Sequence, residues 1–273
     1  MPDDQRTFAI HPLDAMTRLV LPLPPRAVAA LALALAAAAA ALVPDAASAA
    51  PACSARSGAT VPAVVELYTS EGCSSCPPAE HWLTGLKSRP DVVALAFHVD
   101  YWDGLGWKDR FSQPQFTQRQ NATQSTSGAR FAYTPQVLLD GRDQRDWPAL
   151  APGALRGKSP ATVALELAHD ANGLALTVSP GAGAPAKLSG YVAVVDDGLQ
   201  TRVGAGENRG ATLREDGIVR ELLPWNLAGA QPATLRFTSS STPEAGATRR
   251  WVAVATDGPF GRPVQAVALA CAR

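Results

Sequence analysis

The chain has 273 residues, more than the roughly 100–200 of a usual single domain, so one large domain or two small ones are expected. Its 24 basic and 24 acidic residues cancel to a formal net charge of zero, which excludes the basic surface that a nucleic-acid-binding protein needs. With 47% hydrophobic residues, the chain has ample material for a buried core.

An apolar run from Ala27 to Leu42 follows Arg26, and the small residues Ala47-Ser48-Ala49 come soon after it. This order is typical of a secretory signal peptide with an A-x-A cleavage site. We therefore expect residues 1–49 to be a signal peptide, with its true start at Met16, and the mature protein to be periplasmic or secreted. An uncleaved membrane anchor is the alternative, but alanine is only weakly apolar, so no stable span is expected after cleavage.

Four cysteines lie beyond this segment. An even number of cysteines in an oxidising compartment indicates disulfide pairing. Cys53 and Cys271 stand near the two ends, outside any short motif, and we expect them to form one structural disulfide. Two unpaired buried thiols are the alternative. Cys73 and Cys76 are separated by two residues in the stretch EGCSSCPP, and this spacing indicates a role other than that of the first pair.

The elements around this CxxC pair are predicted from short patterns. PAVVEL, residues 62–67, has the composition of a buried strand, and DVVALAFHV, residues 91–99, has it again. Between them, apolar residues recur at helical spacing from Ala79 to Leu86. Pro77 and Pro78 are tolerated only in the first turn of a helix, so they place the cysteines at its N-terminus. We expect a parallel strand–helix–strand unit.

Downstream of this unit, residues 100–112 form an aromatic and glycine-rich loop, and residues 114–124 are expected to be a short helix. A strand containing QVLLD follows, with a turn at Asp140-Gly141 and a return strand. Beyond about residue 158 the sequence alternates apolar and polar residues, first around a hairpin turn at Ala171-Asn172-Gly173.

Several further short strands separated by Gly, Pro, Asn and Asp indicate an antiparallel sandwich in the C-terminal half. The fold class expected from the sequence is therefore an α/β domain at residues 60–158 followed by an all-β sandwich-like domain at residues 159–273.

A thiol at a helix N-terminus is favoured as the thiolate by the positive end of the helix dipole. In this geometry Cys73 would be an exposed nucleophile, and Cys76 a more buried thiol that resolves the mixed disulfide. An inert local disulfide is one alternative. A metal site is another, but there is no second CxxC and only His81 and His98 lie nearby.

Two further features are candidates for supporting roles. Glu66 lies seven residues before Cys73, where a buried carboxylate could move protons to and from Cys76, although an exposed acid at a strand end fits equally well. Thr134-Pro135 precedes a short strand, where a cis bond would pack backbone against its neighbours. An ordinary trans proline in a loop is the alternative.

The order of strand, CxxC helix, strand and Thr-Pro before a hairpin is similar to the thioredoxin fold, whose cis-proline loop faces the reactive cysteines. More closely, the stretches VVELYTSEGCSSCPPAE, LAFHVDYWDGLGWKDRFS, FTQRQ, YTPQVLLDG, GENRGATL and GIVREL resemble DUF1223, a family of exported bacterial proteins of unknown function. The resemblance runs from about Val61 to Val267. It implies a thioredoxin-like fold, with Thr134-Pro135 facing Cys73 and Cys76, and no established substrate.

The stretch HVDYWDGLGWKDRF follows the second strand, at the edge of the sheet where ligands bind in open α/β folds. His98 could assist thiolate formation, or it could be an interior histidine with its partners satisfied. Flat aromatic rings and a nearby carboxylate could form a substrate groove. The candidates for it are Asp100, Tyr101, Trp102 and Trp107. Alternatively, the two tryptophans cap the core between the domains.

These observations predict an exported thiol–disulfide oxidoreductase acting on a protein or small-molecule thiol or disulfide, with no cofactor and no metal ligands. A non-enzymatic cell-envelope binding module with a permanent Cys73–Cys76 disulfide is the competing hypothesis. A third is a copper carrier, because two thiolates and the His98 imidazole suit Cu(I).

Overall fold

The structure, a computed structural model, describes residues 53–151 and 159–271 except 230, together with residues 153, 155 and 157. The expected signal peptide at residues 1–49 lies outside them. None of the helices in the described ranges has the length and apolar character that crossing a bilayer requires.

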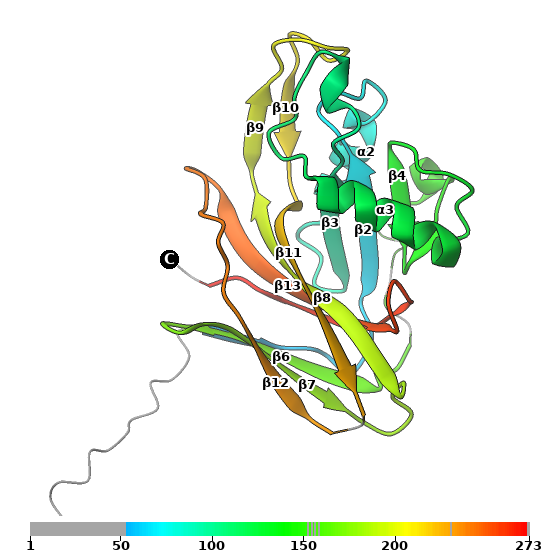
Figure 1. Cartoon of the computed structure of the whole chain (residues 1–273), viewed down its shortest axis with the longest axis vertical. Helices are drawn as coiled ribbons and strands as arrows, with labels where there is room; N and C mark the ends of the chain where they lie inside the picture. The colour runs from blue at the N-terminus through cyan, green and yellow to red at the C-terminus, as the bar shows by residue number, and fades with distance from the viewer. Residues whose placement is uncertain are drawn as a thin grey trace, which may run out of the picture. The chain divides into compact units, whose positions relative to one another are not determined.

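An eight-stranded sheet is the centre of the described structure, with the strand order β14-β13-β8-β11-β3-β2-β4-β5 (Figure 1). The β3 strand pairs in parallel with both β2 and β11, and the other neighbours are antiparallel. The strands are β2 (Ala63–Thr69), β3 (Val92–His98), β4 (Gln136–Leu139), β5 (Arg142–Asp143), β8 (Lys187–Asp197), β11 (Ile218–Ala228), β13 (Thr248–Asp257) and β14 (Pro263–Leu269).

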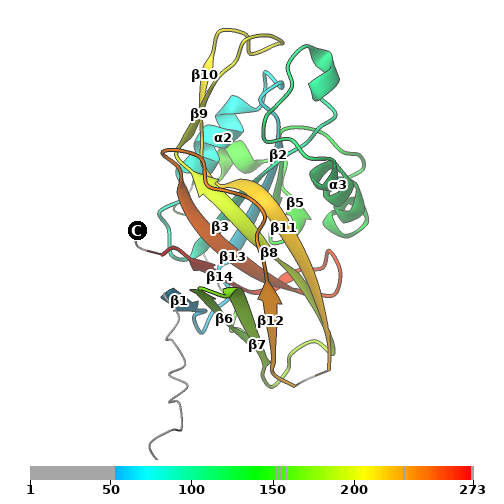
Figure 2. The same cartoon turned by 60° about the vertical axis from the view of Figure 1, so that its left-hand side comes forward.

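A second, antiparallel sheet has the order β1-β6-β7-β12, and β9 and β10 form a two-stranded ribbon that lies against α2 (Figure 2). These strands are β1 (Cys53–Arg56), β6 (Val163–Asp170), β7 (Gly173–Pro180), β12 (Ala233–Phe237), β9 (Leu199–Arg202) and β10 (Thr212–Glu215). The helices of the described residues are α2 (Pro77–Thr84) and α3 (Pro114–Ser127), with single 3-10 turns η1 (Asp103–Leu105) and η2 (Trp147–Ala149).

The predicted strand–helix–strand unit around the CxxC pair is present. β2 and β3 are in parallel register from Ala63 against Val92 to Thr69 against His98. Every residue of both strands is buried, which explains why their sequences are continuous apolar runs without alternation. Helix α2 joins them and begins with two prolines, so the cysteines directly precede the helix.

Both faces of the eight-stranded sheet are covered. Alternate residues of β3 and β13 belong to a cluster that spans the sheet and includes Phe116 of α3. On the opposite face, the intervening residues of β3 pack with α2, and those of β13 pack with the four-stranded sheet. The sheet is therefore sandwiched between α3 on one side and α2 beside the second sheet on the other.

The predicted fold class, an α/β thioredoxin-like domain followed by a separate all-β sandwich-like domain, is wrong. The described chain is mostly β, and strands from before and after residue 158 share one sheet. The N-terminal and C-terminal halves of the chain meet at β3, where the Ala96 N–H donates to the Gly217 carbonyl at 2.7 Å. The Arg250 guanidinium donates to the Ala94 carbonyl at 3.0 Å. The polar backbone groups at the edge of β3 are thus paired by the C-terminal half, as buried backbone groups must be.

Candidate functional site

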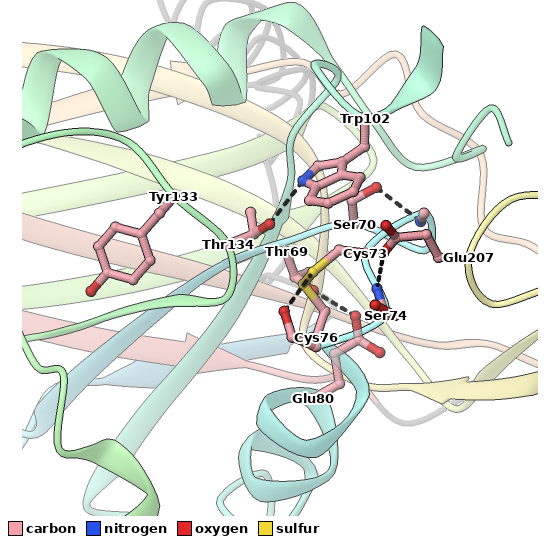
Figure 3. The surroundings of a disulfide bond; sticks show 12 residues. Thr69, Ser70, Cys73, Ser74, Cys76, Glu80, Trp102, Tyr133, Thr134 and Glu207 are labelled. Carbon is pink, nitrogen blue, oxygen red and sulfur yellow. Dashed lines mark hydrogen bonds between the residues drawn. A yellow bond between two sulfur atoms is a disulfide. The ribbon is translucent and has the colours of Figure 1, made fainter. Parts of the chain in front are cut away.

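The Cys73–Cys76 pair forms a disulfide on the turn between β2 and α2 (Figure 3). Cys76 is the N-cap residue of α2, and its side chain makes no capping hydrogen bond. Because Pro77 and Pro78 lack N–H groups, the helix offers its dipole, rather than free donors at these positions, to a sulfur anion. The cysteines therefore stand where the sequence predicts them.

The exposure of the pair differs from the expectation. Cys73 and Cys76 each have 0% relative exposure, and only Ser74 and Ser75 between them face solvent. An attacking thiol must reach a sulfur atom directly. In the described conformation neither sulfur is accessible, so Cys73 is not an exposed nucleophile here.

The segment between β9 and β10, residues 203–211, contacts the CxxC turn, and we refer to it as the clamp. The Asn208 amide donates to the backbone carbonyls of Glu71 and Cys73, both at 2.9 Å. The Glu207 carboxylate accepts from the Ser74 N–H at 3.0 Å. The clamp thus hydrogen-bonds to the backbone of the CxxC turn from 135 residues away in the sequence.

Trp107 lies under the clamp and explains two of its glycines. A Cβ atom at Gly204 would come within 3.1 Å of the Trp107 ring, and one at Gly206 within 3.0 Å of the Trp107 Cβ. Gly206 also has a φ of +71°, which favours glycine. Sequence reasoning missed Glu207 and Asn208, because GENRG gave no indication that it meets the cysteines.

Trp102 connects the CxxC turn to the Thr134-Pro135 loop. Its indole N–H donates to the Thr134 hydroxyl at 2.8 Å, and its ring lies beside the disulfide (Figure 3). A Cβ at Gly72 would lie 3.4 Å from the Trp102 Cβ, so the two backbones approach closely. The Thr134–Pro135 bond is cis. Of the predicted site residues, Trp102 and Thr134 are drawn beside the disulfide in Figure 3.

Glu66 is not brought to the cysteines. It belongs to the α3 face of β2, where its carboxylate pairs with Arg119 at 2.6 Å and accepts from the Tyr191 hydroxyl at 2.6 Å. The α2 face of β2 carries Val65 and Leu67 instead. A proton-transfer role for Glu66 at Cys76 therefore has no geometric support.

A different carboxyl group, Glu80, is buried on the cysteine side. It lies one helical turn after Cys76 and accepts a hydrogen bond from the Thr69 hydroxyl at 2.6 Å. Burial raises the pKa of the Glu80 carboxyl. The spacing of four residues from Cys76 was the sequence signal for it, because residues i and i+4 share one face of a helix.

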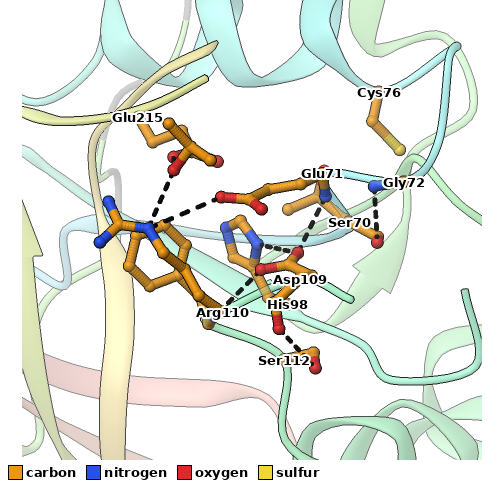
Figure 4. A network of polar contacts seen from close by, with 12 residues as sticks. Ser70, Glu71, Gly72, Cys76, His98, Asp109, Arg110, Ser112 and Glu215 are labelled. Carbon is orange, nitrogen blue, oxygen red and sulfur yellow. Dashed lines mark hydrogen bonds and ion pairs between the residues drawn. The ribbon is translucent and has the colours of Figure 1, made fainter. Parts of the chain in front are cut away.

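His98 is buried behind the turn and directs its Nδ1 to the Asp109 carboxylate at 2.7 Å (Figure 4). Asp109 also accepts from the Glu71 N–H at 2.8 Å. Burial alone would lower the pKa of His98, but the surrounding negative charges, that of Asp109 first, outweigh it and raise the pKa to about 10. For Asp109, burial favours a higher pKa, but the contact with His98 dominates and lowers it.

The remaining predicted groove residues point in different directions. Asp100 accepts from the Thr117 hydroxyl of α3, and Tyr101 is 41% exposed. The Trp107 indole donates to the Glu71 carboxylate at 2.7 Å. Trp107 is therefore a packing residue beneath the clamp, and these three side chains do not line one common groove.

The copper hypothesis required the cysteines and His98 to converge. Within the described ranges, the metal-ligating side chains whose donor atoms lie within 4.8 Å of one another are Glu80, His98 and Glu215, without a cysteine. The geometry therefore gives the Cys73, Cys76 and His98 set no support.

The predicted structural disulfide is confirmed. Cys53 on β1 and Cys271 after β14 are bonded, with their Cα atoms 5.7 Å apart. The bond joins the first strand of the four-stranded sheet to the end of the last strand of the eight-stranded sheet.

The fold recurs in two solved structures. Protein AGR_C_4864 of Agrobacterium tumefaciens is 22% identical, with a TM-score of 0.58 over 78% of this chain and 96% of its own. HBP35 of Porphyromonas gingivalis is 15% identical, with a TM-score of 0.54 over 78% of this chain and 76% of its own. At sequence identities this low, the similarity shows the fold alone. No curated protein matches this chain. The model of the DUF1223 family, whose members are described as proteins of unknown function, matches residues 64–255. The chain therefore belongs to the DUF1223 family.

Proposed function

We propose that the protein performs thiol–disulfide exchange through Cys73 and Cys76. The observation that carries the proposal is the disulfide between the N-cap residue of α2 and a cysteine three positions earlier. A reduced thiol there lies at the positive end of the helix dipole, which lowers its pKa and raises the thiolate fraction.

The reaction has two steps and needs no cofactor. The Cys73 thiolate attacks one sulfur of a substrate disulfide, forms a mixed disulfide and releases the other substrate sulfur as a thiolate. The Cys76 thiolate then attacks the Cys73 sulfur, which releases the second substrate thiolate and forms the Cys73–Cys76 bond. Two electrons pass to the substrate, and the reverse sequence oxidises a dithiol.

Because Cys73 is buried and the clamp is hydrogen-bonded to its turn, we infer that movement of the clamp gives access to Cys73. Its contacts with the turn are two hydrogen bonds from the Asn208 amide and one to the Glu207 carboxylate. Hydrogen bonds of this kind each contribute about 1 kcal/mol, so breaking these three costs about 3 kcal/mol. In the open form, Trp102 and the Thr134-Pro135 loop would border the sulfur atoms and contact a protein or small-molecule substrate.

Export is part of the proposal. The apolar leader and the use of all four cysteines in disulfides both fit a periplasmic or secreted protein, since disulfides persist in oxidising compartments.

The second candidate is a non-enzymatic binding module with a permanent Cys73–Cys76 disulfide. The complete burial of both cysteines favours it, because structural disulfides are shielded from exchange. The two hypotheses differ in one property, which is whether the pair cycles.

The reduction potential of the Cys73–Cys76 pair in a glutathione buffer distinguishes them, with Cys53–Cys271 left intact. We expect a value between about −120 and −270 mV, the range of exchange-competent dithiols. We also expect the variant Cys76→Ser to accumulate a mixed disulfide at Cys73, and the matched variant Cys73→Ser to accumulate none. A potential below about −300 mV without a trapped adduct would exclude exchange and leave the binding module.

A further inference from the structure

A group of buried side chains behind the CxxC turn takes no part in the proposed exchange. Glu80 of α2, His98 of β3 and Glu215 of β10 bring one donor atom each to within 4.8 Å of the others. They have relative exposures of 6%, 1% and 2%. Three elements far apart in the sequence therefore converge on one point in the interior.

Two atoms of this group have no hydrogen-bond partner in the described structure. They are Nε2 of His98 and Oε1 of Glu215, and both are buried. An unpaired buried polar atom costs about 1–3 kcal/mol, and more when it belongs to a charged group. Two such atoms in one cluster indicate a missing partner that could satisfy both.

The charges around the group point to the same conclusion. Glu71 and Asp109 adjoin it, so four carboxyl groups surround a single imidazole. Arg110 lies 4.0 Å from Glu71, outside the group, and its guanidinium pairs with Glu244 at the surface. Buried carboxylates are normally paired or bound to a metal ion.

His98 is oriented as a metal ligand. Its Nδ1 donates to the Asp109 carboxylate at 2.7 Å, so Nε2 is the ring nitrogen left to bind an ion, and it would release its proton on binding (Figure 4). Histidines that bind metals usually make this hydrogen bond to a carboxylate through the other ring nitrogen. The carboxylate groups of Glu80 and Glu215 are themselves oriented by hydroxyls, Thr69 at 2.6 Å and Thr201 at 3.4 Å.

We propose that Glu80, His98 and Glu215 bind one divalent transition-metal ion, and that Asp109 positions His98. The chemistry of these ligands points to Zn²⁺. One imidazole and two carboxylates are donors that zinc accepts at about 2.0–2.2 Å, which places ligand atoms roughly 3.4 Å apart around a tetrahedral ion. Small rotations of the side chains bring donor atoms now within 4.8 Å to that separation. The ion would join α2, β3 and β10 beneath the CxxC turn.

The site does not depend on the proposed exchange, because it contains no cysteine. The test therefore uses the full chain with both disulfides formed, so that no thiolate can bind metal. After removal of metal with a chelator, calorimetric titration with Zn²⁺ is expected to give one ion per chain. Absence of binding to this protein would overturn the proposal.

Variants assign the ligands. Glu215→Gln is expected to weaken Zn²⁺ binding by more than about 100-fold, and Asp109→Asn by about 10–100-fold, the usual cost of losing the partner of a ligand histidine. Glu207→Gln and His169→Gln are matched controls, since Glu207 lies on the clamp and His169 stacks on Trp251 in another cluster. Equal affinity in Glu215→Gln and the unaltered chain would overturn the assignment.

A measurement on the unaltered chain covers the case in which a variant does not fold. X-ray absorption at the zinc edge is expected to report one imidazole, oxygen donors for the remaining positions and no sulfur. A sulfur ligand or a second imidazole would place the ion elsewhere and contradict the proposal.

Discussion

Two buried carboxylates that are close to the CxxC pair in sequence differ because they lie on opposite faces of the sheet. Glu66 points to α3 and binds Arg119, whereas Glu80 points under the cysteines. The sequence could not distinguish them, because β2 is apolar on both faces and lacks the alternation that would identify the face meeting α2. The sequence left open whether Glu66 is buried or exposed at a strand end. No local sequence pattern indicates that Arg119 of α3 is its partner.

We predict that Glu66→Gln lowers stability without changing cysteine chemistry. The substitution leaves the Arg119 guanidinium buried without its counter-charge, which costs about 3–5 kcal/mol when a buried ion pair is broken. The free energy of unfolding from denaturant titration measures this loss. The rate of reduction of the Cys73–Cys76 disulfide should stay the same.

Glu166→Gln is the matched control, because its partner Arg56 is 78% exposed and surface pairs contribute at most about 1 kcal/mol. A slower or faster reduction in Glu66→Gln, with unchanged stability, would restore the proton-transfer hypothesis for Glu66 and contradict the present interpretation.

Asn208 gives a second prediction, on access to the disulfide. Asn208→Ala removes two hydrogen bonds to the turn, worth about 2 kcal/mol together, and the reduction rate should rise roughly tenfold to thirtyfold. The release of thiols under excess dithiothreitol measures the rate. Asn226→Ala, which loses only a contact with Ser189, should not change it. Equal rates in all three proteins would mean that the clamp does not control access.

Several elements follow from local sequence signals. The Asp140-Gly141 turn was predicted from its dipeptide, and both residues have positive φ, as a two-residue hairpin turn requires. The hairpin predicted around Ala171-Asn172-Gly173 joins β6 to β7, with Ala171 and Asn172 in the turn and Gly173 paired with Asp170 at the start of β7. The clamp was not predicted, because its glycines are selected by Trp107, a contact across about a hundred residues that no short pattern reports.

The glycines of the clamp allow a prediction with a matched pair. Gly206 and Gly210 both have positive φ, but only Gly206 faces Trp107, whereas a Cβ at Gly210 meets open space. Both alanine variants should lose about 1 kcal/mol from backbone strain. Only Gly206→Ala should also shift the fluorescence of Trp107 and accelerate reduction of the disulfide. Identical behaviour of the two variants would show that the Trp107 contact is unimportant for the clamp.

The Glu221 carboxylate on β11 makes the stability of the protein depend on pH. Its carboxylate accepts hydrogen bonds from Ser239 and Ser240. Burial favours a higher pKa for Glu221, but these hydrogen bonds outweigh it and lower the pKa below its usual value. A lowered pKa in the folded state stabilises the protein above the unfolded value of about 4.3, and this contribution is lost as the pH falls further.

We therefore expect Glu221→Gln to lower the free energy of unfolding at pH 7 and to leave it nearly unchanged at pH 3, relative to the original chain. Denaturant titrations at the two pH values measure the difference. A loss of the same size at both values would assign the effect to packing rather than to the carboxylate.

The pairing of β3 decides the fold. A strand–helix–strand unit and a run of antiparallel strands are both visible in the sequence, yet periodicity says nothing about which strand edges meet. Here Ile218 of β11 pairs with Ala96 of β3, and the two halves become one sheet. The predicted fold class was wrong for this reason, although the strands predicted at residues 62–67 and 91–99 are present as β2 and β3.

The Cys53–Cys271 disulfide is a second long-range connection, and we expect its removal to destabilise the protein. The two residues are 218 positions apart, so the bond restricts almost the whole unfolded chain. The chain-entropy model gives about 5 kcal/mol for a loop of this length, against about 1.6 kcal/mol for the short Cys73–Cys76 loop.

The double variant Cys53→Ser, Cys271→Ser should therefore lose about 2–5 kcal/mol of unfolding free energy, the range observed when native disulfides are removed. The matched double variant Cys73→Ser, Cys76→Ser should lose less, because its bond closes a loop between residues only three positions apart. Denaturant titration of both variants measures the difference. The opposite order would mean that the CxxC disulfide holds the turn and the clamp in place, and such a stabilising bond would favour the permanent disulfide of the binding module over a pair that cycles.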